Sequence, residues 1–343
     1  MPKKPFEKEK DIRGVEWLHP SLRDISSFDL MGFSPIVDMI LTGSRAKAMA
    51  LQIKIEEMSH QIVLKPDIAN RIIILNKQVS SGDRQPPVKI VIARPANRIF
   101  ELLPVIFYIH GGGLCTGTAE TELPTLARWA AELGCVVVSP EYRMLPEYPY
   151  PAAVDDLQGV YQWIGKNSDE LGIDASRIVA AGSSSGGHLA AALAYRLKDN
   201  GDQQFCAQIL FFPVMDDRFA QPSSNINFAN VWLPGTEQLM WQAWLGDLYG
   251  SDVNPDAVPG RTRDFSGLPP TILHTAELDH GRDDCLAYAQ GLMRAGIFVD
   301  LHVWGGAYHT FDQLQPECEL TERYNNLISA QLKDALTGLL VRK

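Results

Sequence analysis

The sequence predicts an α/β protein whose mostly parallel β-sheet is covered by helices on both faces. Three observations support this fold class. Short apolar segments alternate with amphipathic ones from Pro104 onward, and the apolar segments are continuous, without alternating polar residues. Continuous apolar strands are typical of a sheet that is buried on both sides. The chain has 343 residues, 45% of them hydrophobic, which is enough to bury a large core.

Strand and helix signals follow one another in a regular order. Turn-forming residues separate the segments, and Gly134 directly follows one helical segment, where glycine commonly ends a helix. Runs rich in β-branched and aromatic residues predict strands over residues 71–77, 88–94, 105–109, 135–139, 177–181, 207–212, 271–275 and 299–304. Helical spacing predicts helices over residues 121–133, 152–164, 187–197, 283–295 and 321–340.

Two segments interrupt this alternation. Residues 1–60 show helical spacing, which predicts two or three short helices with no strand between them. Residues 213–265 are too long for a structureless connection between two strands. We expect these two segments to form a helical cap over one edge of the sheet, and residues 61–212 and 266–343 to form the α/β core.

Composition excludes several classes of function. Asp and Glu number 41 against 31 Lys and Arg, so the net charge is −10, and such a chain repels the phosphates of nucleic acids. The five cysteines are widely spaced without a C-x-x-C pair, which argues against disulfides or a zinc site and favours the cytoplasm. The charged start of the sequence lacks a secretory signal, and no apolar run approaches a membrane span. We therefore expect a cytoplasmic enzyme.

A serine motif follows the predicted strand over residues 177–181. Residues 182–186 read G-S-S-S-G and match G-x-S-x-G, in which the central serine occupies a strained turn between a strand and a helix. Only Ser184 has glycine both two positions before and two positions after it, where the backbone must pass closely. Ser184 is therefore the candidate nucleophile. The alternative, a capped helix after a glycine-rich turn, is disfavoured by the preceding strand.

A second glycine motif follows the predicted strand over residues 105–109. The H-G-G-G sequence of residues 110–113 lets the backbone approach a ligand closely and point N–H groups at it. Such a loop, with the N–H of the residue after the nucleophile, can bind an oxyanion. Gly111, Gly112 and Ser185 are the candidate donors, and His110 is expected to order the loop without transferring protons.

A nucleophilic serine needs a base, and the base needs an orienting carboxylate. His309 follows the last predicted strand in a glycine-containing loop, at the sheet edge where this class of fold places its chemistry. For the carboxylate, residues 277–284 follow the strand over residues 271–275 and contain four acids. Asp279 at the apex of this loop is the preferred candidate, and Glu277 is the alternative.

Together these motifs resemble the hormone-sensitive-lipase-like (family IV) carboxylesterases of the α/β-hydrolase superfamily. The matching stretches are HGGG at 110–113, EYRMLPE at 141–147 with PYP at 149–151, GSSSGG at 182–187, GLPP at 267–270, ELDHGRDD at 277–284, and GAYH at 306–309 followed by Phe311 and Asp312. The chain departs from the family's usual G-D-S-A-G and D-P-L-R-D patterns. Ser183 and Ser185 flank the candidate nucleophile, and His280 replaces proline beside Asp279.

The resemblance implies an α/β-hydrolase fold, with an eight-stranded, mostly parallel sheet flanked by helices and a helical cap. It implies a serine esterase that hydrolyses carboxylic esters with short to medium acyl chains, with no cofactor and no metal. It carries the nucleophile role to Ser184, the acid to Asp279 and the base to His309. The expected partner is a small-molecule ester, with no nucleic acid and no membrane span. Some relatives dimerise, which makes a homodimer an option.

Leu114 and Cys115 directly follow the glycine loop and are expected to border the substrate pocket, together with Trp232 from the cap. A thiol reagent is therefore expected to inhibit by blocking the pocket at Cys115. The same triad also fits a lactonase, a thioesterase or an acyltransferase. A third alternative is a noncatalytic ligand receptor on this fold, which His309 disfavours because receptors that resemble this family have lost that histidine.

Overall fold

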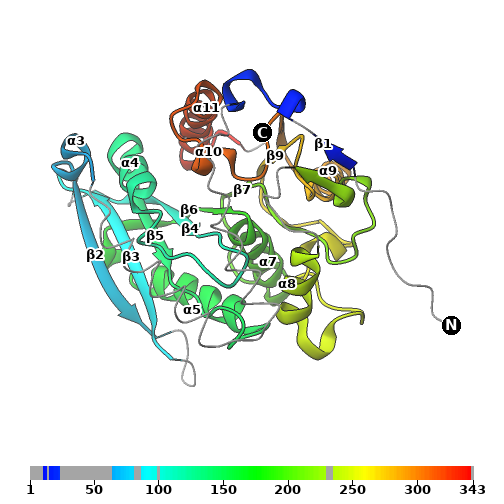
Figure 1. Ribbon diagram of the computed structural model, residues 1–343. Helices are drawn as coiled ribbons and strands as arrows, with labels where there is room; N and C mark the ends of the chain where they lie inside the picture. Colours follow the sequence, from blue (N-terminus) through cyan, green and yellow to red (C-terminus); the bar gives the residue numbers. More distant parts are fainter. Residues whose placement is uncertain are drawn as a thin grey trace.

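An eight-stranded sheet runs through the centre of the molecule in a computed structural model, which describes residues 11–13, 15–23, 64–80, 86–98, 101–228 and 235–340 (Figure 1). The strands are β2 (Ile72–Val79), β3 (Val88–Pro95), β4 (Leu103–Ile109), β5 (Val136–Pro140), β6 (Ile173–Ser183), β7 (Ala207–Phe211), β9 (Thr271–Ala276) and β10 (Val299–Trp304). Their order across the sheet is β10-β9-β7-β6-β4-β5-β3-β2. Only β3 runs antiparallel to its neighbours, β2 and β5. The predicted fold class is confirmed.

Helices cover both faces of the sheet. One face carries α4 (Leu123–Leu133) and α11 (Glu319–Leu336), and the other carries α5 (Ala152–Lys166), α7 (Ser185–Asn200) and α9 (Arg282–Arg294) (Figure 1). Single helical turns form α3 (Pro66–Ala69), α6 (Ser168–Leu171) and α10 (Phe311–Leu314).

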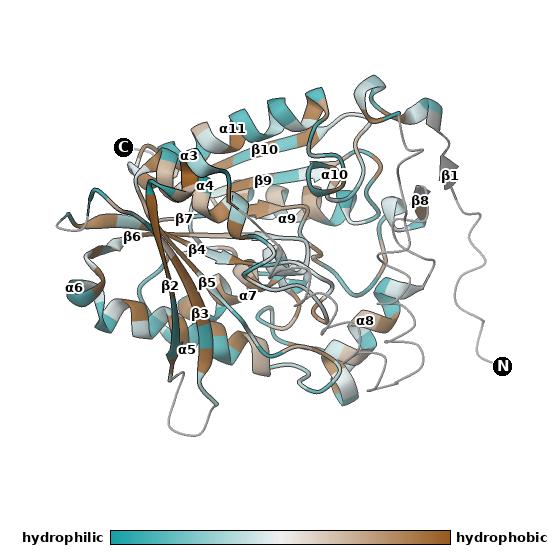
Figure 2. Ribbon diagram, turned by 60° about the vertical axis from the view of Figure 1, so that its left-hand side comes forward, coloured by the Kyte–Doolittle hydropathy of each residue, from teal (hydrophilic) through white to brown (hydrophobic). Residues whose placement is uncertain are grey.

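Alternate residues of each strand supply two separate hydrophobic cores. Val105 and Phe107 of β4 belong to the core that includes α5 and α7, whereas Ile106 and Tyr108 belong to the core that includes α4 and α11. Figure 2 shows the apolar colour of the strands between the two helical layers. Both faces of the sheet are thus buried, which explains why its strands are continuously apolar in sequence.

Helix ends follow the glycine pattern. Gly134 adopts a left-handed conformation, with φ of 65°, and closes α4 as predicted. The last helix, α11, ends at Leu336 and not at residue 340, because Gly338 has a φ of 74° that a helix cannot contain.

Among its described residues, the segment over residues 213–265 contributes no strand to the large sheet. It contains a 3₁₀ helix (Pro222–Asn225), β8 (Ile226–Phe228), α8 (Thr236–Leu245) and two further 3₁₀ helices (Gly246–Leu248 and Pro259–Arg261). We call this segment the insertion.

The insertion pairs with the beginning of the chain. β1 (Asp11–Arg13) lies parallel to β8, with Asp11 opposite Ile226 and Arg13 opposite Phe228. The sequence does not predict β1, which precedes the described helices of residues 1–60 and does not lie between them. Two 3₁₀ helices follow (Val15–Trp17 and Pro20–Leu22), and residues 24–63 lie outside the described residues. Within the described ranges, no helix has both the length and the apolar character needed to cross a bilayer.

Candidate active site

Ser184 occupies the turn between β6 and α7. Its backbone has φ of 55° and ψ of −120°, a conformation that L-residues rarely adopt, and its N–H donates to the carbonyl of Phe211 over 2.8 Å. The flanking glycines are required for space. A Cβ at Gly182 would lie 2.3 Å from the carbonyl oxygen of Gly186, and a Cβ at Gly186 would lie 2.1 Å from that of Ile109. The G-x-S-x-G motif therefore forms the strained turn that its spacing predicts.

Three candidate side chains meet at this turn. The Oγ of Ser184 lies 2.9 Å from Nε2 of His309, and Nδ1 of His309 lies 2.7 Å from Oδ2 of Asp279. Asp279 follows β9 and His309 follows β10, so neighbouring strands deliver the carboxylate and the imidazole to the same edge of the sheet. All three residues are buried. Ser184, His309 and Asp279 thus have the distances that a serine nucleophile, its base and an orienting carboxylate require.

The environment of Asp279 favours its charged form. Its Oδ1 accepts the backbone N–H of Gly281 over 3.0 Å. Burial opposes ionisation, but the imidazoles of His309 and His280 and the N–H of Gly281 together hold the pKa of Asp279 below its ordinary value. Asp279 can therefore remain an anion while His309 takes up a proton.

The alternative acid, Glu277, does not contact His309 among the hydrogen bonds of the described residues. Its Oε2 accepts the N–H of Gly306 over 2.7 Å. Two other histidines after Ser184 have separate partners: Nδ1 of His188 contacts the carbonyl of Val214, and Nε2 of His274 contacts the side chain of Gln331. The structure brings His309 and Asp279, not these residues, to the serine.

The glycine loop lies against Ser184. A Cβ at position 111 would lie 2.8 Å from the carbonyl oxygen of Ser183, so a larger residue would displace the backbone beside Ser184. Within the described part of the chain, the N–H groups of Gly111, Gly112 and Ser185 donate to no protein acceptor. Unused N–H groups beside a nucleophile are the donors that an oxyanion needs.

His110 orders this loop. Its ring stacks on Tyr142 with centroids 4.3 Å apart, and its Nδ1 lies 2.8 Å from the carbonyl of Gly111. The hydroxyl of Tyr142 donates to the carbonyl of His110 over 2.9 Å. Burial lowers the pKa of His110 to about 4, so the ring is neutral near pH 7 and is held by contacts, as expected for a residue that orders the loop.

A cavity of about 750 Å³ opens above Ser184 and His309. Three carboxyl groups line it, and those of Glu122 and Asp312 have raised pKa values, whereas the third belongs to Glu317. Burial and the neighbouring Asp312 raise the pKa of Glu122 to about 7, and burial raises the pKa of Asp312 to about 6. Sequence reasoning missed both as site residues. Asp312 belongs to a stretch that resembles the family and comes three residues after His309, and Glu122 directly precedes the helix that follows the glycine loop.

Comparison with known proteins agrees with this geometry. A family model described as the alpha/beta hydrolase fold matches residues 106–313, which is more than half of the chain. The chain belongs to this family. The resemblance to hormone-sensitive-lipase-like esterases is thereby confirmed, and the matched region includes Ser184, Asp279 and His309.

Similar proteins of this α/β-hydrolase family are esterases by name. The carboxylesterase NlhH of Mycobacterium tuberculosis is 37% identical over 202 residues, which are 58% of this chain and 63% of NlhH. The chain thus matches less than two thirds of that relative. Among solved structures, a bacterial heroin esterase is 33% identical with a TM-score of 0.82, covering 94% of this chain and 99% of that one. The esterase LipW of Mycobacterium marinum is 30% identical with a TM-score of 0.77, covering 95% and 98%.

Two of the three residues expected to bind substrate in this α/β hydrolase, Leu114 and Cys115, do not lie in the described cavity wall. Leu114 and Cys115 are buried, 1% and 3% exposed, in a hydrophobic core and are absent from the described residues that line the cavity. The backbone N–H groups of Cys115 and Thr116 both donate hydrogen bonds to the carbonyl of Gly112. These bonds form a turn that directs Leu114 and Cys115 into the core. Trp232 lies outside the described residues.

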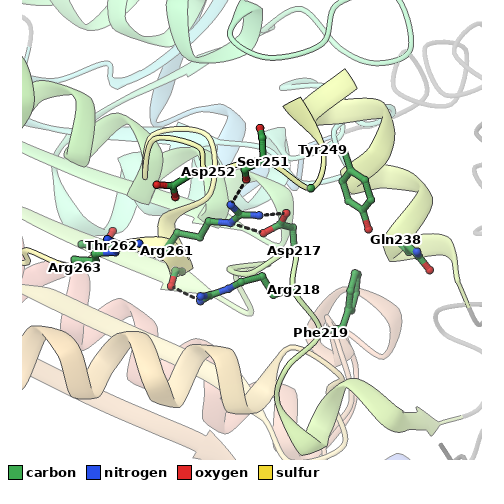
Figure 3. A pocket seen from close by; sticks show the side chains of 12 residues that line it. Asp217, Arg218, Phe219, Gln238, Tyr249, Ser251, Asp252, Arg261, Thr262 and Arg263 are labelled. Atoms are coloured by element: carbon green, nitrogen blue, oxygen red, sulfur yellow. Dashed lines mark hydrogen bonds and ion pairs between the residues drawn. The ribbon is translucent and has the colours of Figure 1, made fainter. Parts of the chain in front are cut away.

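A second cavity of about 660 Å³ lies within the insertion (Figure 3). The positive charge of Arg261 at its centre is neutralised by Asp217. Arg261 donates two hydrogen bonds to Asp217, over 2.8 and 2.6 Å, and one to the carbonyl of Ser251. Neither Ser184 nor His309 is among the described residues that line it. In this α/β hydrolase the second cavity therefore contains a structural ion pair and is separate from the candidate nucleophile Ser184.

Proposed function

We propose that this protein is a serine esterase that hydrolyses carboxylic esters of short to medium acyl chains. The observation that carries the proposal is the aligned set of contacts from Ser184 through His309 to Asp279, of 2.9 and 2.7 Å, at the base of a cavity of about 750 Å³. The esterase names of its relatives support the same class of reaction.

Acylation begins with attack of Ser184 Oγ on the ester carbonyl carbon while His309 Nε2 takes the serine proton. The carbonyl oxygen becomes an oxyanion, for which the N–H groups of Gly111, Gly112 and Ser185 are the donors. The bond between the carbonyl carbon and the alcohol oxygen then breaks, and His309 gives its proton to the leaving alcohol. Asp279 stabilises the imidazolium during this step without taking its proton.

Deacylation repeats these roles with water. His309 removes a proton from water, the hydroxyl adds to the acyl carbon, and the bond to Ser184 Oγ breaks as the serine regains its proton. The product is the free carboxylic acid.

We also propose that residues 1–60 and 213–265 form the cap of this enzyme. The pairing of β1 with β8 and the absence of any strand of the insertion from the large sheet, among the described residues, support this division. A cap of this kind would limit the length of the acyl chain.

Two proposals concern the state of the enzyme. A cytoplasmic location is supported by its five cysteines, which are all free thiols. A homodimer is consistent with β10 at the end of the sheet, where a strand edge is available to a second copy. Light scattering of the purified protein tests the second proposal.

The same triad also fits lactone opening, thioester cleavage and acyl transfer to an alcohol. These reactions differ only in which bond breaks or which acceptor attacks the acyl-enzyme. Partitioning of the acyl group between water and added alcohols distinguishes them. Rapid labelling of Ser184 by a fluorophosphonate would argue against a noncatalytic receptor.

The decisive experiment is a panel of p-nitrophenyl esters graded by acyl length, assayed with the wild type and Ser184→Ala. We expect turnover of short to medium chains by the wild type, and a loss of several powers of ten in the variant. Equal rates for the two proteins would overturn the proposal.

A further inference from the structure

His280 lies directly behind the carboxylate that faces His309. Its Nδ1 is 3.3 Å from Oδ1 of Asp279, and its Nε2 is 2.8 Å from Oε2 of Glu237 in α8. The side chains of these residues are nearly buried, with exposures of 11% for His280, 12% for Glu237 and 3% for Asp279. A chain of polar contacts thus runs from Ser184 through His309, Asp279 and His280 to the insertion.

A carboxylate oxygen lies within ion-pair distance of each nitrogen of the His280 ring, which favours the positively charged, doubly protonated ring. A neutral imidazole carries one N–H, so its other nitrogen would turn a lone pair toward a carboxylate oxygen. Although burial would lower the pKa of His280, Glu237, Asp279 and Asp284 raise it to about 9. Geometry and electrostatics therefore agree on an imidazolium at neutral pH.

Several ionisable groups surround the ring of His280. They come from the loop after β7, from α8, from the loop after β9 with the start of α9, and from the loop after β10. The set is Asp216 with its partner Arg218, Glu237, Asp279, Asp283, Asp284 and His309. Burial, with Asp216 and Glu237 nearby, raises the pKa of Asp284 to about 8, so Asp284 is mostly neutral near pH 7. The imidazolium of His280 is then balanced mainly by Glu237 and Asp279.

The insertion holds this arrangement at two points. The indole N–H of Trp241 donates to Oε1 of Glu237 over 3.4 Å, which leaves Oε2 for His280. The hydroxyl of Ser223 donates to the carbonyl of His280 over 2.8 Å, and the N–H of Ser223 donates to Asp283 over 2.9 Å. Both the backbone and the ring of His280 are therefore fixed by residues 213–265.

We propose that Glu237 and His280 form a positioning pair that keeps Asp279 charged and turned toward His309, and so couples the insertion to the activation of Ser184. With Oδ1 of Asp279 engaged by Gly281 and His280, Oδ2 is the oxygen that faces His309. This inference rests on the proposed esterase function for its physiological meaning, and its test separates the two.

The first variant is His280→Gln, which removes the positive charge and keeps an amide donor. The rings of His280 and His309 have centroids 5.8 Å apart, so loss of this charge makes protonation of His309 easier. We expect the acidic limb of kcat/KM to move to higher pH by about one unit. The value of kcat should fall while KM stays nearly constant, because neither residue of the pair lines the described cavity wall.

The second variant is Glu237→Gln, which deprives His280 of its other carboxylate. We expect it to change the pH profile in the wild-type background and to have little effect in the His280→Gln background, since the pair acts as a unit. Ser223→Ala is the matched control, because it loosens the same loop without changing charge. His302→Gln on β10 controls for the loss of a histidine.

The readouts are kcat/KM for p-nitrophenyl acetate and the rate of fluorophosphonate labelling of Ser184, both from about pH 5 to 9. An unchanged acidic limb in His280→Gln, an equal shift in Ser223→Ala, or additive effects in the double variant would overturn the pair. If the wild type cleaves no ester, the proposed function fails, and the labelling profile still tests the pair. If His280→Gln does not fold, the titration of His280 is followed by histidine ¹⁵N NMR in the wild type and in Glu237→Gln. The proposed pair requires His280 to lose its proton at lower pH in Glu237→Gln than in the wild type.

Discussion

Glu277 Oε2 lies 2.7 Å from the backbone nitrogen of Gly306 and accepts its N–H, which ties the end of β9 to the loop that carries His309. The carbonyl of Gly306 in turn accepts the N–H of His19 over 2.9 Å. Glu277, the alternative acid in the sequence, is therefore placed to support the loop without contacting the imidazole.

Replacing Glu277 with Ala should affect the stability of the fold more than the catalytic activity. A hydrogen bond to a charged group contributes about 2 kcal/mol, so the free energy of unfolding in urea should fall by about that amount. Activity should fall by about tenfold or less, whereas Asp279→Asn should cost about 10⁴-fold in kcat, because the amide leaves the wrong tautomer of His309. Equal losses of activity in the two variants would contradict the assignment of Asp279.

Gly182→Ala should disable the turn that carries Ser184. The added Cβ would meet the carbonyl oxygen of Gly186 at 2.3 Å, and backbone atoms cannot move aside without shifting the serine. We expect a loss of about 1–3 kcal/mol of stability and, from displacement of the nucleophile, about 10²-fold in kcat. Gly165→Ala is the control, because nothing lies within 4 Å of its Cβ and helix propensity favours alanine. Similar losses in both variants would refute the steric explanation.

The sequence alone predicts the large sheet and the contacts around Ser184 because their signals are local. The central strands β4 and β5 are largely apolar runs, and Asp279 and His309 each follow a strand of a parallel sheet, whose carboxyl ends share one edge. The motif at Ser184 contains within five residues the glycines that its backbone needs.

Local sequence patterns do not predict features that depend on contacts between residues far apart in the chain. β1 has three residues, and its pairing with β8 joins positions more than two hundred residues apart, which no local pattern encodes. The inward turn after Gly112, which buries Leu114 and Cys115, depends on backbone hydrogen bonds and not on hydrophobicity. The contact of His280 with Glu237 likewise joins the loop after β9 to α8 and needs the folded insertion.

Thiol reagents should not inhibit through Cys115, contrary to the expectation from its place in the sequence. Burial raises the pKa of its thiol to about 12 and leaves it 3% exposed, so the reactive thiolate is scarce and shielded. Iodoacetamide should first modify Cys206 and Cys318, which are only partly buried, with activity retained. Peptide mass spectrometry with parallel assays measures this. Loss of activity in step with modification of Cys115 would contradict the prediction.

The carboxyl of Glu122 should make the fold less stable as pH rises. Its pKa of about 7 in the folded chain, raised by burial and by Asp312, exceeds the ordinary value of 4.5. An acid whose pKa is raised on folding binds more protons in the native state, so its stability is fully present below about pH 4.5 and is lost as pH rises through about 7. The same ionisation adds negative charge to the cavity above Ser184.

Glu122→Gln removes this titration while keeping the shape of the side chain. We expect the variant to exceed the wild type by about 1–2 kcal/mol in free energy of unfolding at about pH 8, and to differ little at about pH 4.5. Glu132→Gln, on the exposed surface of the same helix, should change stability by less than about 0.5 kcal/mol at both values. Urea unfolding followed by tryptophan fluorescence measures these differences. A gain from Glu122→Gln that is equal at both pH values would contradict the prediction, because stability depends on pH only where folding changes the pKa of the carboxyl.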